Sequence, residues 1–450
     1  CTGGAASRCY QAGAWYANGE MIQVHPTAIP GADKCRLMSE SARGEGGRVW
    51  VPRKQGDTRD PRQIPEGERW YFLEEKYPAY GNLVPRDIAT REIFDVCVNQ
   101  HMGVDGENQV YLDLTHKPRE YLDRKLGAIL EIYEKFAGDD PREMPMKIFP
   151  AVHYSMGGLW TTYKQGGYEP SSPHGDHKPG MMPPVDPEPG MGMRQGAIEN
   201  SMTNINGLYA FGEVNFAYHG ATRLGANALL SCIFDGLYCG MSVANYAREQ
   251  QPSSQLPSET FERAVRQEED KAKRLTESAG GGGSSGAPDP ETNPYQIAKE
   301  MGEEMTAACT VVKTEERLEQ CLDTVGQLRE RFSRVRLGDS AAWSNQALSF
   351  ARSVGDMLIL AESIAKTSLA RRESRGSHYR LDYPERDDSQ FLRTTISAYT
   401  PGEPDGRPDG HDVSYRDVDT GLVIPRARTY GKVESDPKAG AEKKEAAATS

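Results

Sequence analysis

The sequence predicts an α/β protein followed by a purely helical region. Apolar side chains recur at helical spacing from Arg119 to Phe136, inside a region of otherwise mixed pattern. A turn and a buried strand are expected at 203–213, followed by a glycine-rich loop and a helix from about Asn227. Residues 258–370 show a helical pattern. At 450 residues the chain is long enough for two to four domains.

The first 150 residues are expected to open with a short strand and turn over 1–22 and to continue as a mixed region. The helix expected at 119–136 has a start signal in Pro118. Its apolar face consists of Leu122, Leu126, Ile129, Leu130 and Tyr133.

The segment 161–200 is dense in proline, glycine and methionine and is expected to be a surface loop. It contains His174 and His177, two potential metal ligands three residues apart. No further ligand of a suitable type follows closely, since Asp176 and Asp186 lie in the proline-rich stretch. We therefore favour a loop over a metal site and predict no bound metal.

The most apolar stretch runs from Gly225 to Ala247 and is broken by Asn227, Asp235 and Asn245. A membrane-spanning helix needs about 20 largely uncharged apolar residues. We interpret this stretch as a buried core helix.

The later helices have two expected apolar faces and one clear start. One face comprises Leu318, Leu322, Val325 and Phe332, and the other Leu348, Ala351, Leu358, Ala361 and Ala365. A helix should start at Thr314, because two glutamates follow it. The last 75 residues or so are polar and extended in pattern, and the tail 439–450 is expected to fray.

The glycines Gly281, Gly283 and Gly286 formally match the GxGxxG dinucleotide fingerprint. That motif needs a strand before it and a helix after it. Here a charged helical segment precedes the glycines and an Ala-Pro-Asp-Pro segment follows them. A flexible linker is the better interpretation.

Composition excludes one class of partner. The formal net charge of −12 disfavours non-specific binding to nucleic acid, which depends on neutralisation of phosphates by Lys and Arg. The eight cysteines include no CxxC motif, so no zinc ribbon and no cysteine-ligated iron–sulfur site is evident. Scattered free thiols and a reducing compartment are expected.

Four groups of residues could carry chemistry. The first joins His25 and Thr27 to Ser39, Glu40 and Arg43, flanked by glycines that allow close approach of a ligand. Taken together these residues form a plausible anion site, although each alone could be a polar surface residue.

The second and third groups are Arg86 with Asp87, and the segment from His153 to Gly158. Each has a simpler alternative, a salt-bridged helix start and a turn with a surface histidine. The fourth runs from His219 to Leu229, where a glycine-rich turn opens a helix. Free N–H groups at a helix start bind anions, and Arg223 adds a fork for a carboxylate or phosphate. Tight helix packing is the alternative there.

These four groups, in this order, resemble the succinate dehydrogenase/fumarate reductase flavoprotein family. The resemblance runs from Thr2 to about Asp388 and includes the block Arg371–Asp388 (RRESRGSHYRLDYPERDD). Within the family, the Trp50–Arg53 segment and the long proline-rich insertion resemble the branch that pairs with a two-haem membrane anchor.

The resemblance implies a fold: part of an FAD-binding Rossmann-like domain with an inserted α+β capping domain, then a helical domain and an extended C-terminal domain. The expected parts are 1–22 (remnant of the FAD-binding domain), 23–150 (capping domain), 151–250 (return to the FAD-binding domain), 255–370 (helical domain) and 371–450 (C-terminal domain with a disordered tail). The charged block at 371–388 is expected either to be a solvated surface or to pack near an iron–sulfur subunit or the cofactor domain.

The resemblance also implies a C4 dicarboxylate substrate held at both ends. His25 and Ser39 would hold one carboxylate, and His153 and Arg223 the other. The family more often has Thr where Ser39 stands, so the hydroxyl is kept and a methyl is lost.

Proton transfer is assigned by the resemblance to Arg86, with a relay through Glu40 and Arg43. Arginine is normally protonated up to a pH of about 12, so the relay must restore its proton quickly. Glu40 and Arg43 are three residues apart and would share a face of a helical turn. Hydride would pass between substrate and flavin.

Cofactor contacts are also implied. FAD would be held by Glu213 at its ribose and by the backbone N–H groups of Ala228 and Leu229. Thr2, Gly3 and Gly4 match an inner strand-turn near the cofactor. The family's glycine-rich FAD pyrophosphate motif and its flavin-attaching histidine would both lie before Cys1, so we interpret the sequence as an N-terminally truncated fragment.

The implied partners are succinate or fumarate, an iron–sulfur protein subunit, and a membrane anchor subunit with haem and quinone, with no nucleic acid. The implied location is the cytoplasmic face of the inner membrane, as a peripheral protein. Two alternatives stay open: an L-aspartate oxidase, which shares a Glu-Ser-Arg-Gly-x-His-Tyr block, and a non-catalytic fragment. The sequence does not encode the physiological direction of catalysis.

Overall fold

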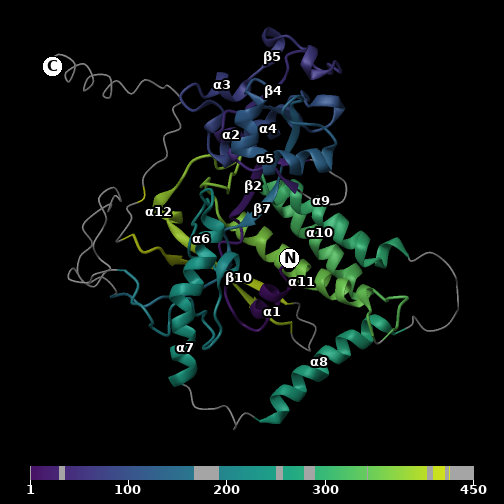
Figure 1. Ribbon diagram of the computed structural model, residues 1–450. Helices are drawn as coiled ribbons and strands as arrows, with labels where there is room; N and C mark the ends of the chain where they lie inside the picture. Colours follow the sequence, from purple (N-terminus) through teal and green to yellow (C-terminus); the bar gives the residue numbers. More distant parts are fainter. Residues whose placement is uncertain are drawn as a thin grey trace. The chain divides into compact units, whose positions relative to one another are not determined.

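The computed structural model describes residues 2–29, 36–166, 192–249, 257–277, 289–341, 343–402, 409–420 and 425. The chain divides into two compact units (Figure 1). Unit 1 comprises Cys1–Gln23 and Tyr154–Ile424, and unit 2 comprises Val24–His153 and Pro425–Ser450. The chain passes from one unit to the other within two strands, β2 and β7.

A six-stranded sheet in the order β3-β2-β7-β6-β4-β5 organises unit 2. The pairs β2–β3, β6–β7, β4–β6 and β4–β5 are antiparallel. The elements are β2 (Ile22–Ile29), β3 (Arg36–Leu37), α2 (Ser41–Gly44), β4 (Arg48–Pro52), β5 (Arg69–Trp70), α3 (Phe72–Lys76), α4 (Arg86–Phe94), β6 (Val110–Asp113), α5 (Arg119–Ala137) and β7 (Met146–Ser155).

The helix expected at 119–136 is confirmed as α5, which starts after Pro118. Its end is set by Gly138, whose φ of 85° suits a glycine that closes a helix. Of the expected apolar face, all but Ile129 are fully buried in the core of this unit. That core also contains the indole of Trp50, whose Nε1 donates to Asp113 Oδ2 at 3.2 Å.

Unit 1 combines an antiparallel four-stranded sheet, β10-β9-β1-β8, with a set of long helices. Its elements are α1 (Gly4–Gln11), β1 (Tyr16–Ala17), β8 (Gly158–Leu159), η6 (Gly212–Val214), α6 (Asn227–Phe234), η7 (Asp235–Cys239, a π-helical turn), α7 (Gly240–Glu249), α8 (Ser258–Thr276), α9 (Pro294–Cys309), α10 (Glu315–Ser333), α11 (Gln346–Ala370), α12 (Asp388–Phe391), β9 (Arg393–Thr400) and β10 (Gly410–Asp417). The mixture of helices and sheets agrees with the predicted class.

The helical pattern of 258–370 is confirmed by α8 to α11. Both expected apolar faces contribute to one core between α9, α10 and α11. Helix α10 begins after Thr314, whose hydroxyl accepts a hydrogen bond from Arg317 N–H at 3.3 Å. Asn293 and Asn345 cap α9 and α11 in the same way.

Two local expectations were wrong. The N-terminal segment forms the helix α1, which starts after Gly3 in the left-handed region (φ 73°), where a short strand was expected. Within 203–213, the described backbone forms an isolated bridge, Met202–Tyr209, and the turn η6 in place of a strand.

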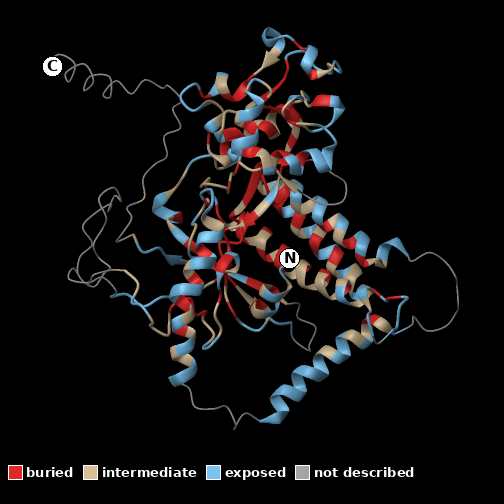
Figure 2. Ribbon diagram, viewed as in Figure 1, coloured by how far each residue is buried: buried red, intermediate tan, exposed pale blue. Residues whose placement is uncertain are grey.

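The interpretation of 225–247 as a buried core helix was also wrong. The continuous helix α6–η7–α7 is mostly exposed or half-exposed (Figure 2), and its few buried side chains are small or polar. Ser231, Asp235 and Ser242 are buried, whereas the large apolar side chains Leu229, Leu230, Ile233, Leu237 and Met241 are exposed. The sequence pattern failed here because periodicity reveals two faces but not which of them is covered. By length and composition alone, Asn227–Glu249 would suffice to cross a membrane.

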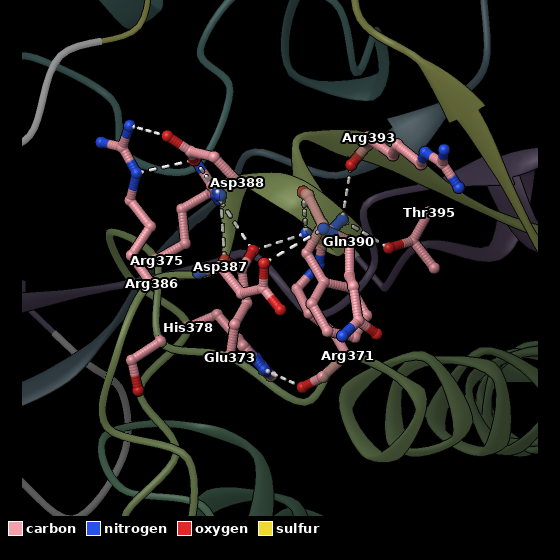
Figure 3. A network of polar contacts seen from close by, with 12 residues as sticks. Arg371, Glu373, Arg375, His378, Arg386, Asp387, Asp388, Gln390, Arg393 and Thr395 are labelled. Carbon is pink, nitrogen blue, oxygen red and sulfur yellow. Dashed lines mark hydrogen bonds and ion pairs between the residues drawn. The ribbon is translucent and has the colours of Figure 1, made fainter.

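The charged block 371–388 has both buried and exposed residues in unit 1, and a solvated surface was the wrong alternative for four of them. Arg371, Glu373, His378 and Arg380 are fully buried. The five N–H donors of Arg371 make five bonds, as Figure 3 shows in part. Their acceptors are Glu20 Oε1 (2.6 Å), Glu373 Oε1 (2.8 Å), Phe391 O (2.9 Å), Arg393 O (2.7 Å) and Thr395 Oγ1 (2.7 Å).

Some expectations concern residues outside the described part of the chain. These are the paired histidines His174 and His177, the glycines from Gly281 to Gly286 and the tail 439–450. The expected helical domain and residues 371–424 of the expected C-terminal domain belong to unit 1, while the expected capping domain (23–150) overlaps unit 2.

Candidate functional site

In unit 2, Glu40 lies between two arginines. Its Oε1 accepts from Arg43 Nη2 at 2.8 Å, and its Oε2 accepts from Arg86 Nε at 2.7 Å and Nη2 at 2.5 Å. The expected sharing of a helical face by Glu40 and Arg43 is confirmed, since Glu40 precedes α2 and Arg43 lies three residues later. Arg86, which is 46 residues further along, is the first residue of α4.

Arg43 is buried more deeply than Arg86, whose side chain is 10% exposed. The side chain of Arg43 is only 2% exposed, and its Nη1 donates to the carbonyls of Asn82 (2.7 Å) and Val84 (3.1 Å). Burial lowers the pKa of Arg43; the charge of Glu40 opposes this shift, and the nearby charge of Arg86 adds to it. A buried arginine with a lowered pKa, joined through one carboxylate to a second arginine, is suited to pass a proton.

His25 and His153 also lie together in unit 2. Their ring centroids are 5.0 Å apart and the rings are inclined at 72°. His25 is almost fully buried on β2 and His153 is half-buried on β7, the neighbouring strand of the sheet. Two imidazoles on neighbouring strands can present N–H donors to one anionic ligand.

Thr27 fixes the orientation of the His25 ring. The Thr27 backbone N–H donates to His25 Nδ1 at 3.2 Å, and the Thr27 hydroxyl lies 3.1 Å from the same atom. Because Nδ1 accepts the backbone proton, the neutral ring carries its own proton on Nε2. Nε2 is therefore the atom of His25 that can donate to a carboxylate.

Ser39 is placed by the β2–β3 hairpin. Thr27 and Met38 are joined by a backbone bond of 2.9 Å and by the Thr27 hydroxyl, which donates to Met38 O at 2.8 Å. Ser39 follows directly and is half-buried. Its hydroxyl lies 3.1 Å from that of Ser41 and accepts from the Ser41 N–H at 3.3 Å, at the start of α2.

Arg223 belongs to unit 1, where it packs against the ring of Tyr154. Its guanidinium lies 4.4 Å from the ring centroid of Tyr154, and its carbonyl accepts from Gln23 Nε2 at 2.7 Å. The ring of His219 meets Tyr154 edge-on at 5.4 Å. Burial lowers the pKa of His219, and the positive charge of Arg223 adds to the effect, so His219 stays neutral beside the arginine.

The loop of Arg223 rests on the charged block. Ser377 N–H donates to Ala221 O at 2.9 Å, and the hydroxyls of Thr222 and Ser377 are 3.1 Å apart. A Cβ at Gly376 would lie 2.5 Å from Ala221 O, so only glycine permits this approach. His378 closes the turn through two backbone bonds with Arg375.

The residues expected at the cofactor lie in two further segments of unit 1. Glu213, in η6, is exposed and accepts from Ser155 N–H at 3.0 Å. Ala228 and Leu229 are in the first turn of α6, which follows Ala226 in the left-handed region (φ 65°) and has no side-chain cap. Thr2, Gly3 and Gly4 stand at the start of α1, which corrects the expected strand-turn.

Several residues that position the predicted site residues were given no individual role from the sequence. Thr27, from the first group, bonds to His25, while Tyr154 packs against Arg223 and His219 contacts Tyr154. Asn82 binds Arg43 through its backbone carbonyl. Thr27, Tyr154 and His219 stand inside the recognised motifs, so motif position could have indicated them. The contact of Asn82 with Arg43 depends on the tertiary structure.

Comparison with known proteins defines the class first. Residues 1–182 match a family model described as an FAD binding domain, and residues 298–430 match one described as the C-terminal part of fumarate reductase flavoprotein. The chain is 48% identical over 432 residues to a succinate dehydrogenase flavoprotein subunit of Bacillus subtilis. It is 30% identical over 432 residues to a fumarate reductase flavoprotein subunit of Escherichia coli. The matched class is that of FAD-dependent flavoproteins.

Solved structures agree with this class. A structure of E. coli quinol fumarate reductase superposes with a TM-score of 0.72 at 26% identity, over 96% of this chain and 64% of that one. Adenylylsulfate reductase from Archaeoglobus fulgidus superposes with a TM-score of 0.57 at 15% identity, so the fold alone does not fix the substrate. The chain is thus similar to the flavoprotein subunits of succinate dehydrogenase and fumarate reductase. The match to the B. subtilis relative spans 96% of this chain and 63% of that protein. The match to the E. coli relative spans 95% of this chain and 61% of that protein.

Proposed function

We propose that this chain carries the substrate-binding and proton-transferring residues of a flavoenzyme that interconverts succinate and fumarate. The observation that carries the proposal is the Arg43–Glu40–Arg86 arrangement, in which one carboxylate bridges two arginines. The 48% identity to a succinate dehydrogenase flavoprotein subunit supports the substrate class.

In the proposed reaction, one methylene carbon of succinate loses a hydride and the other loses a proton. When bound, FAD accepts the hydride. In this direction Arg86 first gives its own proton to Glu40 and then takes the proton from the substrate carbon; in the reverse direction it gives a proton to that carbon. Glu40 touches both arginines, so it can carry the proton on to Arg43, whose lowered pKa eases proton release.

Substrate specificity is proposed to come from two separate groups of donors. His25, through Nε2, and Ser39 would hold one carboxylate; His153 and Arg223 would hold the other. Imidazole N–H groups, a hydroxyl and a guanidinium all donate to carboxylates. A substrate with a carboxylate at each end is therefore favoured over a monocarboxylate.

The residues proposed to hold FAD have suitable chemistry. Glu213 is an exposed carboxylate that can accept from ribose hydroxyls. The uncapped first turn of α6 directs the N–H groups of Ala228 and Leu229 outward, where partial positive charge favours an anionic group. Thr2, Gly3 and Gly4 offer the same chemistry at the start of α1. We propose the Rossmann-like FAD-binding architecture with an inserted capping domain on the basis of the family match.

We propose that electrons leave through an iron–sulfur subunit to a membrane anchor subunit with haem and quinone, at the cytoplasmic face of the membrane. Support comes from relatives named as succinate dehydrogenase and fumarate reductase subunits. A structural neighbour, quinol–fumarate reductase with menaquinol, superposes with a TM-score of 0.70 at 27% identity.

The test is succinate-dependent reduction of an artificial electron acceptor by the protein purified as its native complex. We expect turnover with succinate and none with L-aspartate. Turnover with aspartate but not succinate would identify an aspartate oxidase. A flavin-containing preparation that oxidises neither compound and does not reduce fumarate would refute the proposed function.

A further inference from the structure

Asp235 is a buried carboxylate inside the most apolar helix of the chain. Its side chain is 1% exposed, although the helix around it exposes leucines and isoleucine. It begins the π-helical turn η7 between α6 and α7. A π-turn redirects side chains relative to a regular helix and often marks a functional position.

The Asp235 carboxylate binds three parts of unit 1. Oδ2 accepts from the Gly212 N–H at 2.6 Å, in the turn that carries Glu213. Oδ1 accepts from the Tyr218 hydroxyl and, at 3.4 Å, from the Ser201 hydroxyl. A bond from an N–H to a buried carboxylate is charge-assisted and stronger than a neutral one.

The Gly212 turn is closely confined. Gly212 has a φ of 66°, and a Cβ at this position would lie 2.9 Å from the Sγ of Cys232, which is on the helix that carries Asp235. Beyond it, Glu213 accepts from the Ser155 N–H at 3.0 Å. The turn is thus bonded by Asp235 on one side and by Ser155 on the other, while Glu213 stays exposed.

Tyr218 extends the influence of Asp235 toward Arg223. The Tyr218 ring lies 6.2 Å from His219, which contacts the Tyr154 ring that packs against Arg223. Burial raises the pKa of Tyr218, and the bond to Asp235 raises it further, so the phenol remains a donor. One carboxylate therefore bonds to two segments that carry predicted site residues.

We infer that Asp235 is a positioning residue: it holds the Gly212–Glu213 turn so that the Glu213 carboxylate is preorganised for the cofactor. The inference rests on the proposed role of Glu213. Removing Asp235 would leave the buried Gly212 N–H unsatisfied and allow the turn to move, which would weaken FAD binding.

The experiment measures FAD dissociation constants by fluorescence titration of apoprotein, prepared from riboflavin-starved cells as the native complex. The flavin-attaching histidine that the resemblance implies is replaced in every variant, so that FAD binding stays reversible. We expect Asp235→Leu to raise the dissociation constant roughly tenfold, which corresponds to about 1.4 kcal/mol. Asp235→Asn should stay within about threefold, because its amide oxygen can still accept from Gly212 while its NH₂ donates to Tyr218.

Asn245→Leu is the matched control. Asn245 anchors the same helix through Nδ2 to Gly196 O at 2.7 Å, but it has no bond to the Glu213 turn. The Asn245→Leu variant should have a lower melting temperature and an unchanged FAD affinity. Equal losses of affinity in Asn245→Leu and Asp235→Leu would overturn the inference, because the effect would then be general anchoring of the helix.

A double-mutant cycle separates this inference from the proposed function. If Asp235 acts through Glu213, then Asp235→Leu should add little to Glu213→Ala. Fully additive losses would refute the positioning role. An unchanged affinity in Glu213→Ala alone would instead refute the proposed cofactor contact. If Asp235→Leu does not fold, Tyr218→Phe replaces it in the experiment. We expect Tyr218→Phe to weaken FAD affinity about threefold, and an unchanged affinity would count against the inference.

Discussion

At the scale of single residues, Glu40 determines what Arg43 and Arg86 can do. It contacts both arginines, while Arg43 is also fixed by two backbone carbonyls. Arg43 is therefore held by Glu40 and by the backbone of Asn82 and Val84 together. Arg86 begins helix α4 and shares the Glu40 carboxylate, so this one carboxylate connects the two arginines.

Substituting Arg86 tests its proposed role in proton transfer. We expect Arg86→Gln and Arg86→Lys to lower kcat at least about 100-fold while flavin stays bound, since positioned proton transfer contributes about 10²–10⁴-fold. The measurement is steady-state succinate oxidation with parallel flavin absorbance. Arg91→Gln, on the same helix α4, is the control and should retain most activity. Near-normal turnover in Arg86→Gln would remove Arg86 from this role.

His153 is expected to act on binding more than on chemistry. His153→Ala should raise KM for succinate roughly tenfold with a smaller change in kcat, because a hydrogen bond to a charged group contributes about 1.5–3 kcal/mol. Initial rates across a range of succinate concentrations give both constants. An unchanged KM would show that His153 does not hold a carboxylate.

At the scale of elements, the helix α6–η7–α7 shows how far sequence pattern reaches. The sequence predicted the start of the helix near Asn227, but not that its large apolar side chains lie outward. The three polar residues that seemed to interrupt it include Asp235 and Asn245, which anchor its inner side. The i,i+3 spacing of Glu40 and Arg43 was sufficient to predict their contact, whereas the contact with Arg86 depends on tertiary structure 46 residues away.

Substitutions on this helix should test its outward apolar face. Leu237 is 67% exposed, so Leu237→Gln should change the stability of this 450-residue chain by less than about 0.5 kcal/mol. The control is Leu358→Ala in α11, where the side chain is 1% exposed and truncation should cost about 2–5 kcal/mol. Thermal unfolding followed by circular dichroism measures both. Equal losses would mean that Leu237 is covered.

At the scale of the whole molecule, stability depends on the buried charges around Arg371. The charged block 371–388 was difficult to interpret from the sequence, because the same run of charged residues can form either a solvated surface or a buried network of ion pairs. The distinction lies in partners far away in the chain, above all Glu20 and Thr395.

Two adjacent arginines allow a matched test. Arg371→Lys should destabilise the chain by about 3 kcal/mol or more, because lysine cannot reproduce five donors in a planar fork and leaves buried acceptors unpaired. Arg372→Lys should change stability by less than about 1 kcal/mol, since the Arg372 side chain is 57% exposed and pairs with Glu315 at the surface. Urea unfolding curves give both values. Similar midpoints for the two variants would contradict the importance of the Arg371 network.

His378 should make stability depend on pH. Burial, reinforced by the charge of Lys313 2.9 Å away and by Arg371 and Arg380, holds the pKa of His378 well below 6.5. The folded state therefore resists protonation, the unfolded state does not, and stability falls as pH drops below about 6.5. The slope from this group should approach about 1.4 kcal/mol per pH unit. His378→Gln should flatten the profile, whereas exposed His101→Gln should not; an unchanged slope in His378→Gln would refute this origin.

The long reach of Arg371 has a consequence for the order in which the chain can fold during synthesis. In the part of the chain that the structure describes, the buried residues of the unit 2 core lie between residues 29 and 148, so they leave the ribosome together and well before Arg371. Glu20, by contrast, can pair with Arg371 only after a further 351 residues have been synthesised. Domains generally fold as units while the N-terminal part of a protein emerges first. Unit 2 should thus form on the nascent chain, while residues near Glu20 stay solvated until the C-terminal strands have been made.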